Sequence, residues 1–200
     1  QYKDDVESFD ARELVTFVAR NAAESFVERA FSGSIVQRLL SGAPGRDAED
    51  ALEDRGGQLA IFEDREEHTV AGLAARMRAR SGDGADPVEV LNAVQPHLLA
   101  AAWAHIDRLL LEAFAEVAEG CDDGPTREIL CMVCDLFVLS TVEANAAWFL
   151  EHSRISAGQS RAITRRVDQL CAELAPHAET LVAAFGIAPA WVACPLIASA

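Results

Sequence analysis

The sequence predicts an all-α fold, an up-and-down bundle of about five long helices in a single domain covering residues 1–200. Apolar residues recur at three- and four-residue intervals in several long segments, the spacing of a helix with one buried side. Short breaks containing glycine or proline separate these segments, which favours antiparallel neighbours. Half of the 200 residues are hydrophobic, enough for a sizeable core, while there is one tyrosine and there are few β-branched runs.

The first helix is predicted over residues 10–31, with Asp10 as its N-cap. Ser32-Gly33-Ser34 interrupts or kinks it, residues 35–40 continue it, and the glycines and proline of residues 42–45 end it. The apolar stripe of this helix consists of Leu14, Phe17, Val18, Ala22, Phe26 and Ala30.

A polar loop closing at Gly56-Gly57 leads to a second helix over residues 58–80, with a weaker apolar pattern. The third helix is predicted over 87–120, because Asp86 is a suitable N-cap and proline is favoured at the first helical position. Pro96 should bend this helix. The helical period is held up to Gly120 by Leu91, Val94, Leu98, Ala102, Ile106, Leu109, Ala113 and Val117.

The fourth helix is predicted from Pro125 to about His152, and its low charge places it at the centre of the bundle. Ser156 caps the fifth helix, which ends at Gly186, with Pro176 marking a kink or a restart. The predicted buried stripe of the fifth helix is Ile163, Val167, Leu170, Leu174, Ala178, Leu181 and Phe185.

The net charge of −15 opposes binding to nucleic acid, which is itself a polyanion. The acidic excess is densest over residues 47–67, which we interpret as a solvated surface, with a docking face as the alternative. No segment reaches the roughly 20 apolar residues of a membrane span, and the N-terminus shows no secretion signal. Five cysteines fit reduced thiols, so we expect a cytoplasmic protein without a membrane partner.

Cys131 and Cys134 form a Cys-x-x-Cys pair inside an apolar helix, with no preceding strand. A thioredoxin-like site needs the thiol at a helix N-terminus, so we interpret the pair as packed structural thiols. The pair does not indicate a zinc site, because the sequence has no second cysteine pair and no histidine nearby. No histidine has Glu or Asp three residues before it, which excludes the Glu-x-x-His motif of di-iron bundles.

Three further groups have both a functional and a structural interpretation. His97 and His105 share a helix face and suit a groove, although half-exposed histidines are commoner. Glu112 and Glu116 are spaced as an acid and base pair, although surface helices carry such pairs routinely. The aromatic residues Trp103, Trp148 and Phe149 suit either a helical core or an acyl pocket. The sequence contains no phosphate loop, nucleophile elbow or dinucleotide fingerprint, so we assign no catalytic, cofactor-binding or metal residue.

Residues 130–140, from Leu130-Cys131 to Leu139-Ser140, are followed by Trp148-Phe149-Leu150-Glu151-His152. In these segments the chain resembles the C-terminal helical domain of bacterial acyl-CoA oxidases. Further segments resemble the family in the same order: Arg65-Glu66-Glu67-His68, Asn92 to Leu99, Ala104-His105-Ile106-Asp107-Arg108, Leu170 to Ala178, and Leu181 to Ile187. Pro96, Phe137 and Ala175 depart from the family pattern, which suggests a substrate other than an ordinary fatty acyl-CoA.

The resemblance implies an FAD-dependent oxidoreductase of lipid metabolism that desaturates an acyl thioester at Cα and Cβ and passes electrons to oxygen. It also implies that FAD and the catalytic residues belong to an upstream domain or partner subunit, to which residues 1–9 would be the linker. This chain would then have a structural and assembly role, within a dimer or hetero-oligomer. The alternatives are a stand-alone helical binding module with Trp103 and Trp148 in an acyl pocket, and an enzyme acting alone.

Overall fold

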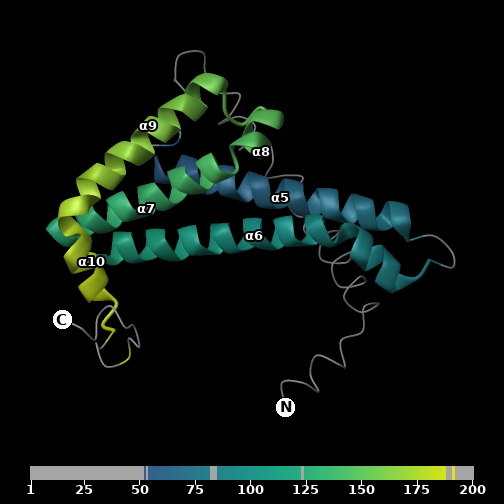
Figure 1. The fold of residues 1–200 in the computed structure, drawn as a ribbon, viewed down its shortest axis with the longest axis horizontal. Helices are drawn as coiled ribbons and strands as arrows, with labels where there is room; N and C mark the ends of the chain where they lie inside the picture. The colour runs from purple at the N-terminus through teal and green to yellow at the C-terminus, as the bar shows by residue number, and fades with distance from the viewer. Residues whose placement is uncertain (1–51, 53, 82–84, 123, 188–190, 192–200) are drawn as a thin grey trace, which may run out of the picture.

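The computed structural model describes residues 52, 54–81, 85–122, 124–187 and 191, and every regular element in these ranges is a helix (Figure 1). The all-α prediction is therefore confirmed for this part of the chain. The predicted first helix, residues 10–31, lies outside the described residues, as do the predicted linker, residues 1–9, and most of the acidic segment before residue 54.

Consecutive long helices alternate in direction, as the up-and-down prediction requires (Figure 1). Helix α6 packs against α5 and α7, and α7 also packs against α9, which crosses it obliquely. The centrally placed α7 is the predicted fourth helix. In chain order the elements are α5 (Arg55–Arg80), α6 (Pro87–Gly120), α7 (Pro125–Ala144), α8 (Ala146–Glu151), α9 (Ala157–Leu174), the 3₁₀ turn η1 (Ala175–His177) and α10 (Ala178–Ala184).

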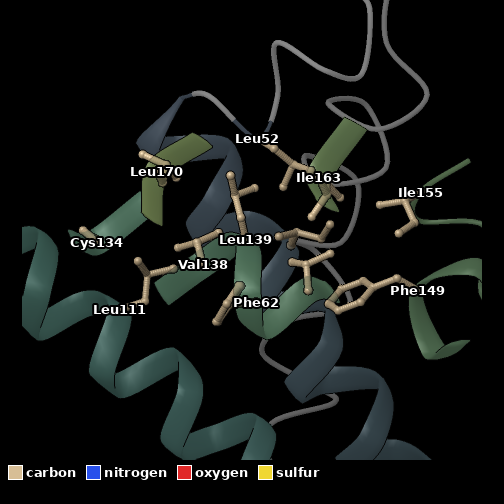
Figure 2. Close-up of a cluster of buried hydrophobic side chains, with 12 residues drawn as sticks. Leu52, Phe62, Leu111, Cys134, Val138, Leu139, Phe149, Ile155, Ile163 and Leu170 are labelled. Carbon is tan, nitrogen blue, oxygen red and sulfur yellow. The ribbon is translucent and has the colours of Figure 1, made fainter. Parts of the chain in front are cut away.

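The main core lies where α5, α6, α7 and α9 converge, with α8 closing one side (Figure 2). Phe62, Leu111, Val138, Phe149 and Leu170 are all nearly or fully buried there. Burying each of these side chains contributes about 1.5–3 kcal/mol. A smaller cluster joins α5 to the first half of α6 and contains Leu73, Met77, Val94 and Ala101.

Helix α5 begins three residues earlier than predicted, at Arg55. The Asp54 carboxylate accepts a hydrogen bond from the backbone N–H of Gly57 at 3.2 Å and so caps the helix. Gly56 and Gly57 therefore belong to its first turn and do not close a loop. The predicted caps at Asp86 and Ser156 are confirmed, and Gln159 completes a capping box with Ser156.

The predicted continuous fourth helix is wrong, because Asn145 separates α7 from α8. The Asn145 side-chain amide donates to the Thr141 carbonyl at 2.8 Å, the same carbonyl that the Asn145 backbone N–H reaches at 3.2 Å. Asparagine side chains compete in this way with regular helical bonding. The chain consequently kinks and restarts at Ala146.

Both internal prolines act at the predicted positions. Pro96 lies inside α6, whose first turns are inclined to the remainder of the helix (Figure 1). Pro176 lies in η1, so the fifth helix restarts as α10. The predicted buried stripe of that helix is correct for Ile163, Leu170 and Leu174 and wrong for Ala178 and Phe185, which are exposed, while Val167 and Leu181 are half-buried.

Candidate functional site

Helix α6 is apolar on two opposite faces, and only one of them is buried. The buried face contains mainly small residues, which allow the neighbouring helices to approach closely. It consists of Val90, Val94, Ala101, Ala104, Leu111, Ala115 and Ala118.

The opposite face of α6 carries larger apolar side chains that are exposed in this chain. We call it the α6 seam, and it consists of Leu99, Trp103, Ile106, Leu110, Ala113 and Val117. Trp103 is 61% exposed and Val117 is 57% exposed. The residues that hold the predicted helical period do not all lie on the buried face, since Ala102, Ile106, Leu109, Ala113 and Val117 are exposed.

The seam positions are separated by four, three, four, three and four residues. Alternating spacings of three and four are the repeat by which one helix packs along another in a coiled coil. The earlier residues on this side, Val88, Asn92 and Gln95, are uncharged as well. A charge-free stripe of this length has the character of an interaction surface.

Behind the seam, Arg65 of α5 joins three helices. Its guanidinium lies 2.8 Å from the Asp107 carboxylate of α6 and donates to the Asn145 side-chain oxygen at 2.8 Å. It also lies over the Phe149 ring, 5.9 Å from the centroid. A buried arginine with both ends of its fork satisfied fixes the positions of α5, α6 and the α7–α8 kink relative to one another.

Glu66, the next residue, forms a second polar group with α6. Its carboxylate accepts from Arg108 and lies 2.9 Å from His105 Nδ1, while Arg108 also donates to Glu112. Burial would raise the pKa of Glu66, but the hydrogen bonds from Arg108 and His105 outweigh burial and lower it. Burial likewise opposes the charge on Arg108, and its bonds to Glu66 and Glu112 nevertheless raise the pKa of Arg108.

These contacts decide between the interpretations of the histidine and glutamate pairs. His105 is half-exposed and bonded to Glu66, whereas His97 is exposed, so the two do not share a groove. Glu112 pairs with Arg108 while Glu116 is exposed, so the two do not act as an acid and base pair. The structural interpretation is confirmed for both.

The acidic surface predicted over residues 47–67 is wrong for Asp64 and Glu66. The Asp64 carboxylate accepts hydrogen bonds from Nε and Nη2 of Arg154 at 2.6 and 2.8 Å. This pair joins the turn after α8 to α5. Glu66 is buried against Arg108, whereas Glu63 is exposed as expected. Two acidic residues of this segment therefore form tertiary contacts and are not part of a solvated surface.

The interpretation of Cys131 and Cys134 as packed thiols is confirmed. Cys134 is fully buried in the main core, and Arg55 donates to its sulfur at 2.9 Å. Burial raises the pKa of the Cys134 thiol, which disfavours the reactive thiolate. Gln58, also buried, donates to the Leu52 carbonyl and to Asp135 at 2.7 and 3.1 Å, so this polar end of the core is satisfied.

Trp148 packs against two histidines away from the seam. Its ring stacks on His152 at 4.4 Å between centroids, and His68 meets both rings edge-on. Burial, together with the nearby His152, lowers the pKa of His68. Phe149 is core, as the structural interpretation predicts, but Trp103 is neither core nor part of a pocket because it is largely exposed. The hypothesis of an acyl pocket lined by Trp103 and Trp148 is therefore wrong.

An open hollow of about 490 Å³ lies between α7 and α9 and is lined by Leu139, Ile163, Asp135 and Arg166 among others. Asp135 already pairs with Arg55 and Arg166 with Glu173. Over the described ranges, the structure shows no group of three or more His, Cys, Asp and Glu side chains that could hold a metal ion. In the same ranges, no helix combines the length and apolarity needed to cross a membrane.

The sequence did not reveal the roles of Arg65, Gln58 and Arg154. Their charge or polarity can be read from the sequence, but the side chains that they contact cannot. A signal was nevertheless present, since the family-like segments Arg65-Glu66-Glu67-His68 and Ala104 to Arg108 contain both halves of the two polar groups. Pairing these segments required the α5–α6 register, which only the structure gives.

Over the residues that the structure describes, fold and site define a helical domain whose buried polar side chains have hydrogen-bond partners and whose helix α6 has an exposed apolar face. Residues 54–196 match the acyl-CoA oxidase family, and the chain belongs to that family. The resemblance stated from the sequence is thereby confirmed as an acyl-CoA oxidase-type helical domain.

Similar proteins agree with this assignment. The peroxisomal acyl-coenzyme A oxidase 2 of Arabidopsis thaliana is 28% identical over 143 residues, which cover 70% of this chain and 20% of the relative. The acyl-coenzyme A oxidase-like protein of Mus musculus is 27% identical over 48% of this chain and 15% of its own length. The chain thus spans about a fifth or less of these relatives.

Solved structures show the same fold. Arabidopsis thaliana acyl-CoA oxidase 1 superposes with a TM-score of 0.68 at 21% identity, covering 88% of this chain and 27% of the oxidase. Acyl-CoA oxidase 3 of Yarrowia lipolytica superposes with a TM-score of 0.63 at 20% identity, covering 85% of this chain and 25% of the oxidase.

Proposed function

We propose that this chain is the C-terminal helical domain, or a separate subunit, of an FAD-dependent acyl-CoA oxidase or dehydrogenase, with a structural and assembly role. The observation that carries the proposal is the family match over residues 54–196 by a chain that spans only a fifth of the Arabidopsis relative. The remaining activity of such a protein must then come from sequence that this chain does not contain.

In this proposal the complete assembly removes hydrogens from Cα and Cβ of an acyl thioester and passes the electrons to oxygen. FAD would supply the redox chemistry and would be bound by an upstream domain or partner subunit. Asp135 and Arg166, two of the three charged side chains that line the hollow between α7 and α9, are held by partners within the chain, so we do not propose this hollow as the flavin site. We derive no chemical step through this chain.

The packing supports an assembly role. Arg65 and Glu66 are held by buried polar contacts, which suits a rigid scaffold. The free cysteines Cys121, Cys131, Cys134 and Cys171 fit a reducing compartment, and we place the assembly in the cytoplasm on that ground.

Purification of the 200-residue chain with and without the flavin-bearing portion tests this function. We expect the chain alone to be colourless and inactive, and the combination to form a stable complex that produces hydrogen peroxide from an acyl-CoA. Flavin absorbance and peroxide production by the chain alone would overturn the proposal. Failure of the flavin-bearing portion to bind the chain would overturn the proposal as well.

A further inference from the structure

From the geometry of α6 we infer that the seam is the docking surface for a helix of the flavin-bearing portion. This inference rests on the proposed function and adds the face, the packing mode and the chemistry of the partner surface. The seam residues are Leu99, Trp103, Ile106, Leu110, Ala113 and Val117.

The packing mode follows from the spacing. Alternation of three and four residues keeps one row of side chains on a straight line along the helix, and a partner helix can follow that line at a crossing angle of about 20°. From Leu99 to Val117 the seam runs about 27 Å at 1.5 Å per residue, long enough for several turns of a partner helix. Both ends of the row, Leu99 and Val117, are more than half exposed among the residues that the structure describes.

The chemistry of the occupant follows from charge. The seam itself carries no charged side chain, and Leu109 and Ala102 widen it on one side. Beyond Leu109 that side ends at the exposed carboxylate of Glu116. The complementary surface is therefore an apolar helix face with a basic residue opposite Glu116.

A second copy of this chain is a poor occupant by the same reasoning. Each copy carries a net charge of −15, with 17 lysines and arginines against 32 acidic residues. Two copies would repel each other at low salt and would offer few cations for Glu116. The chain covers only 27% of Arabidopsis acyl-CoA oxidase 1, so the larger remainder of such a protein is available as the partner.

Charge substitutions on the seam test the inference by binding measurements between the full chain and the flavin-loaded remainder of the assembly. We expect Ile106→Glu and Leu110→Glu each to weaken association by at least about tenfold, since a buried apolar contact is replaced by a charge. Leu150→Glu is the matched control, because Leu150 is an exposed leucine on α8. We expect Leu150→Glu to bind like the unmodified chain.

Trp103 provides a spectroscopic readout of docking on the otherwise unmodified seam. In fluorotryptophan-labelled chain, the ¹⁹F resonance of Trp103, assigned with Trp103→Phe, should shift when the flavin-bearing portion is added. The resonance of Trp148, which packs against His68 and His152, should not shift. Urea unfolding of each variant separates lost binding from lost folding.

The outcomes separate the two proposals. If the unmodified chain binds and the seam variants bind equally well, the docking face is wrong and the proposed function stands. If the unmodified chain does not bind, both fail. If sedimentation shows a dimer of this chain that Leu110→Glu dissociates, the occupant is a second copy and the inference is overturned.

Discussion

Arg65 on α5 and Asp107 on α6 form an ion pair at 2.8 Å although they lie 42 residues apart in the sequence. Their side chains are only 8% and 17% exposed. The second guanidinium nitrogen reaches Asn145 at the kink between α7 and α8. One side chain thus holds the register of the α5–α6 hairpin and the position of the kink.

Arg65→Met should lower the free energy of unfolding by about 3 kcal/mol, because it leaves the Asp107 carboxylate buried without its partner. Urea unfolding of the full chain measures this loss. Arg166→Met is the control, since the Arg166–Glu173 pair is exposed and should contribute under about 1 kcal/mol. Equal losses in the two variants would contradict a special role for Arg65.

Stability should fall in acid partly through Glu66. Its pKa is lowered in the folded state from an ordinary value of 4.5, so its contribution is complete above pH 4.5. The contribution is lost as the pH falls through the folded-state pKa. Unfolding free energies measured across this range should decrease less steeply in Glu66→Gln than in the unmodified chain. Parallel pH profiles would show that Glu66 does not titrate as described.

The cysteines should differ in reactivity according to burial. Cys171 is exposed, whereas Cys134 is buried with a raised thiol pKa, so iodoacetamide should modify Cys171 at least about tenfold faster. Peptide mass spectrometry after timed alkylation measures both rates. In denaturant the two rates should become similar, and rapid modification of Cys134 in the native chain would contradict its buried position.

Ser153, in the turn after α8, has a positive φ of 55°. This left-handed conformation strains residues with a Cβ atom and costs about 1 kcal/mol relative to glycine. Ser153→Gly should therefore raise the midpoint of urea unfolding, and Ser153→Val should lower it because β-branched residues fit this region worst. A stabilising valine would contradict the turn geometry.

Helix periodicity predicted the described helices well but did not show which face of α6 is buried. The larger apolar residues from Leu98 to Val117 and the alanines between them both satisfy a helical period. In the structure the smaller residues Ala101, Ala104 and Ala115 face the neighbouring helices, since close packing favours small side chains there. Hydrophobicity alone does not contain that information.

Two helix starts with local caps were predicted, whereas the local cap at Asp54 was missed because Gly56-Gly57 indicated a loop. An end that depends on a tertiary contact was not predicted. Ser156 and Asp86 are caps whose partners lie within three residues, and both were predicted. The kink at Asn145 also involves Arg65, which lies 80 residues earlier. Likewise, the contacts of Arg65 and Glu66 form only when α5 packs against α6. The sequence shows these residues but does not show which residues they contact.

The division of residue size between the two sides of α6 sets which substitutions each side tolerates. At Ala101, Ala104 or Ala115 even an added methyl group would push neighbouring helices apart, whereas polar replacements at Ile106 or Leu110 leave the isolated fold undisturbed. Homologous chains should therefore keep small residues on the buried side, and should vary in polarity on the seam side only when nothing is bound there. Comparing how homologous sequences vary on the two sides of α6 would therefore show independently which side binds another protein.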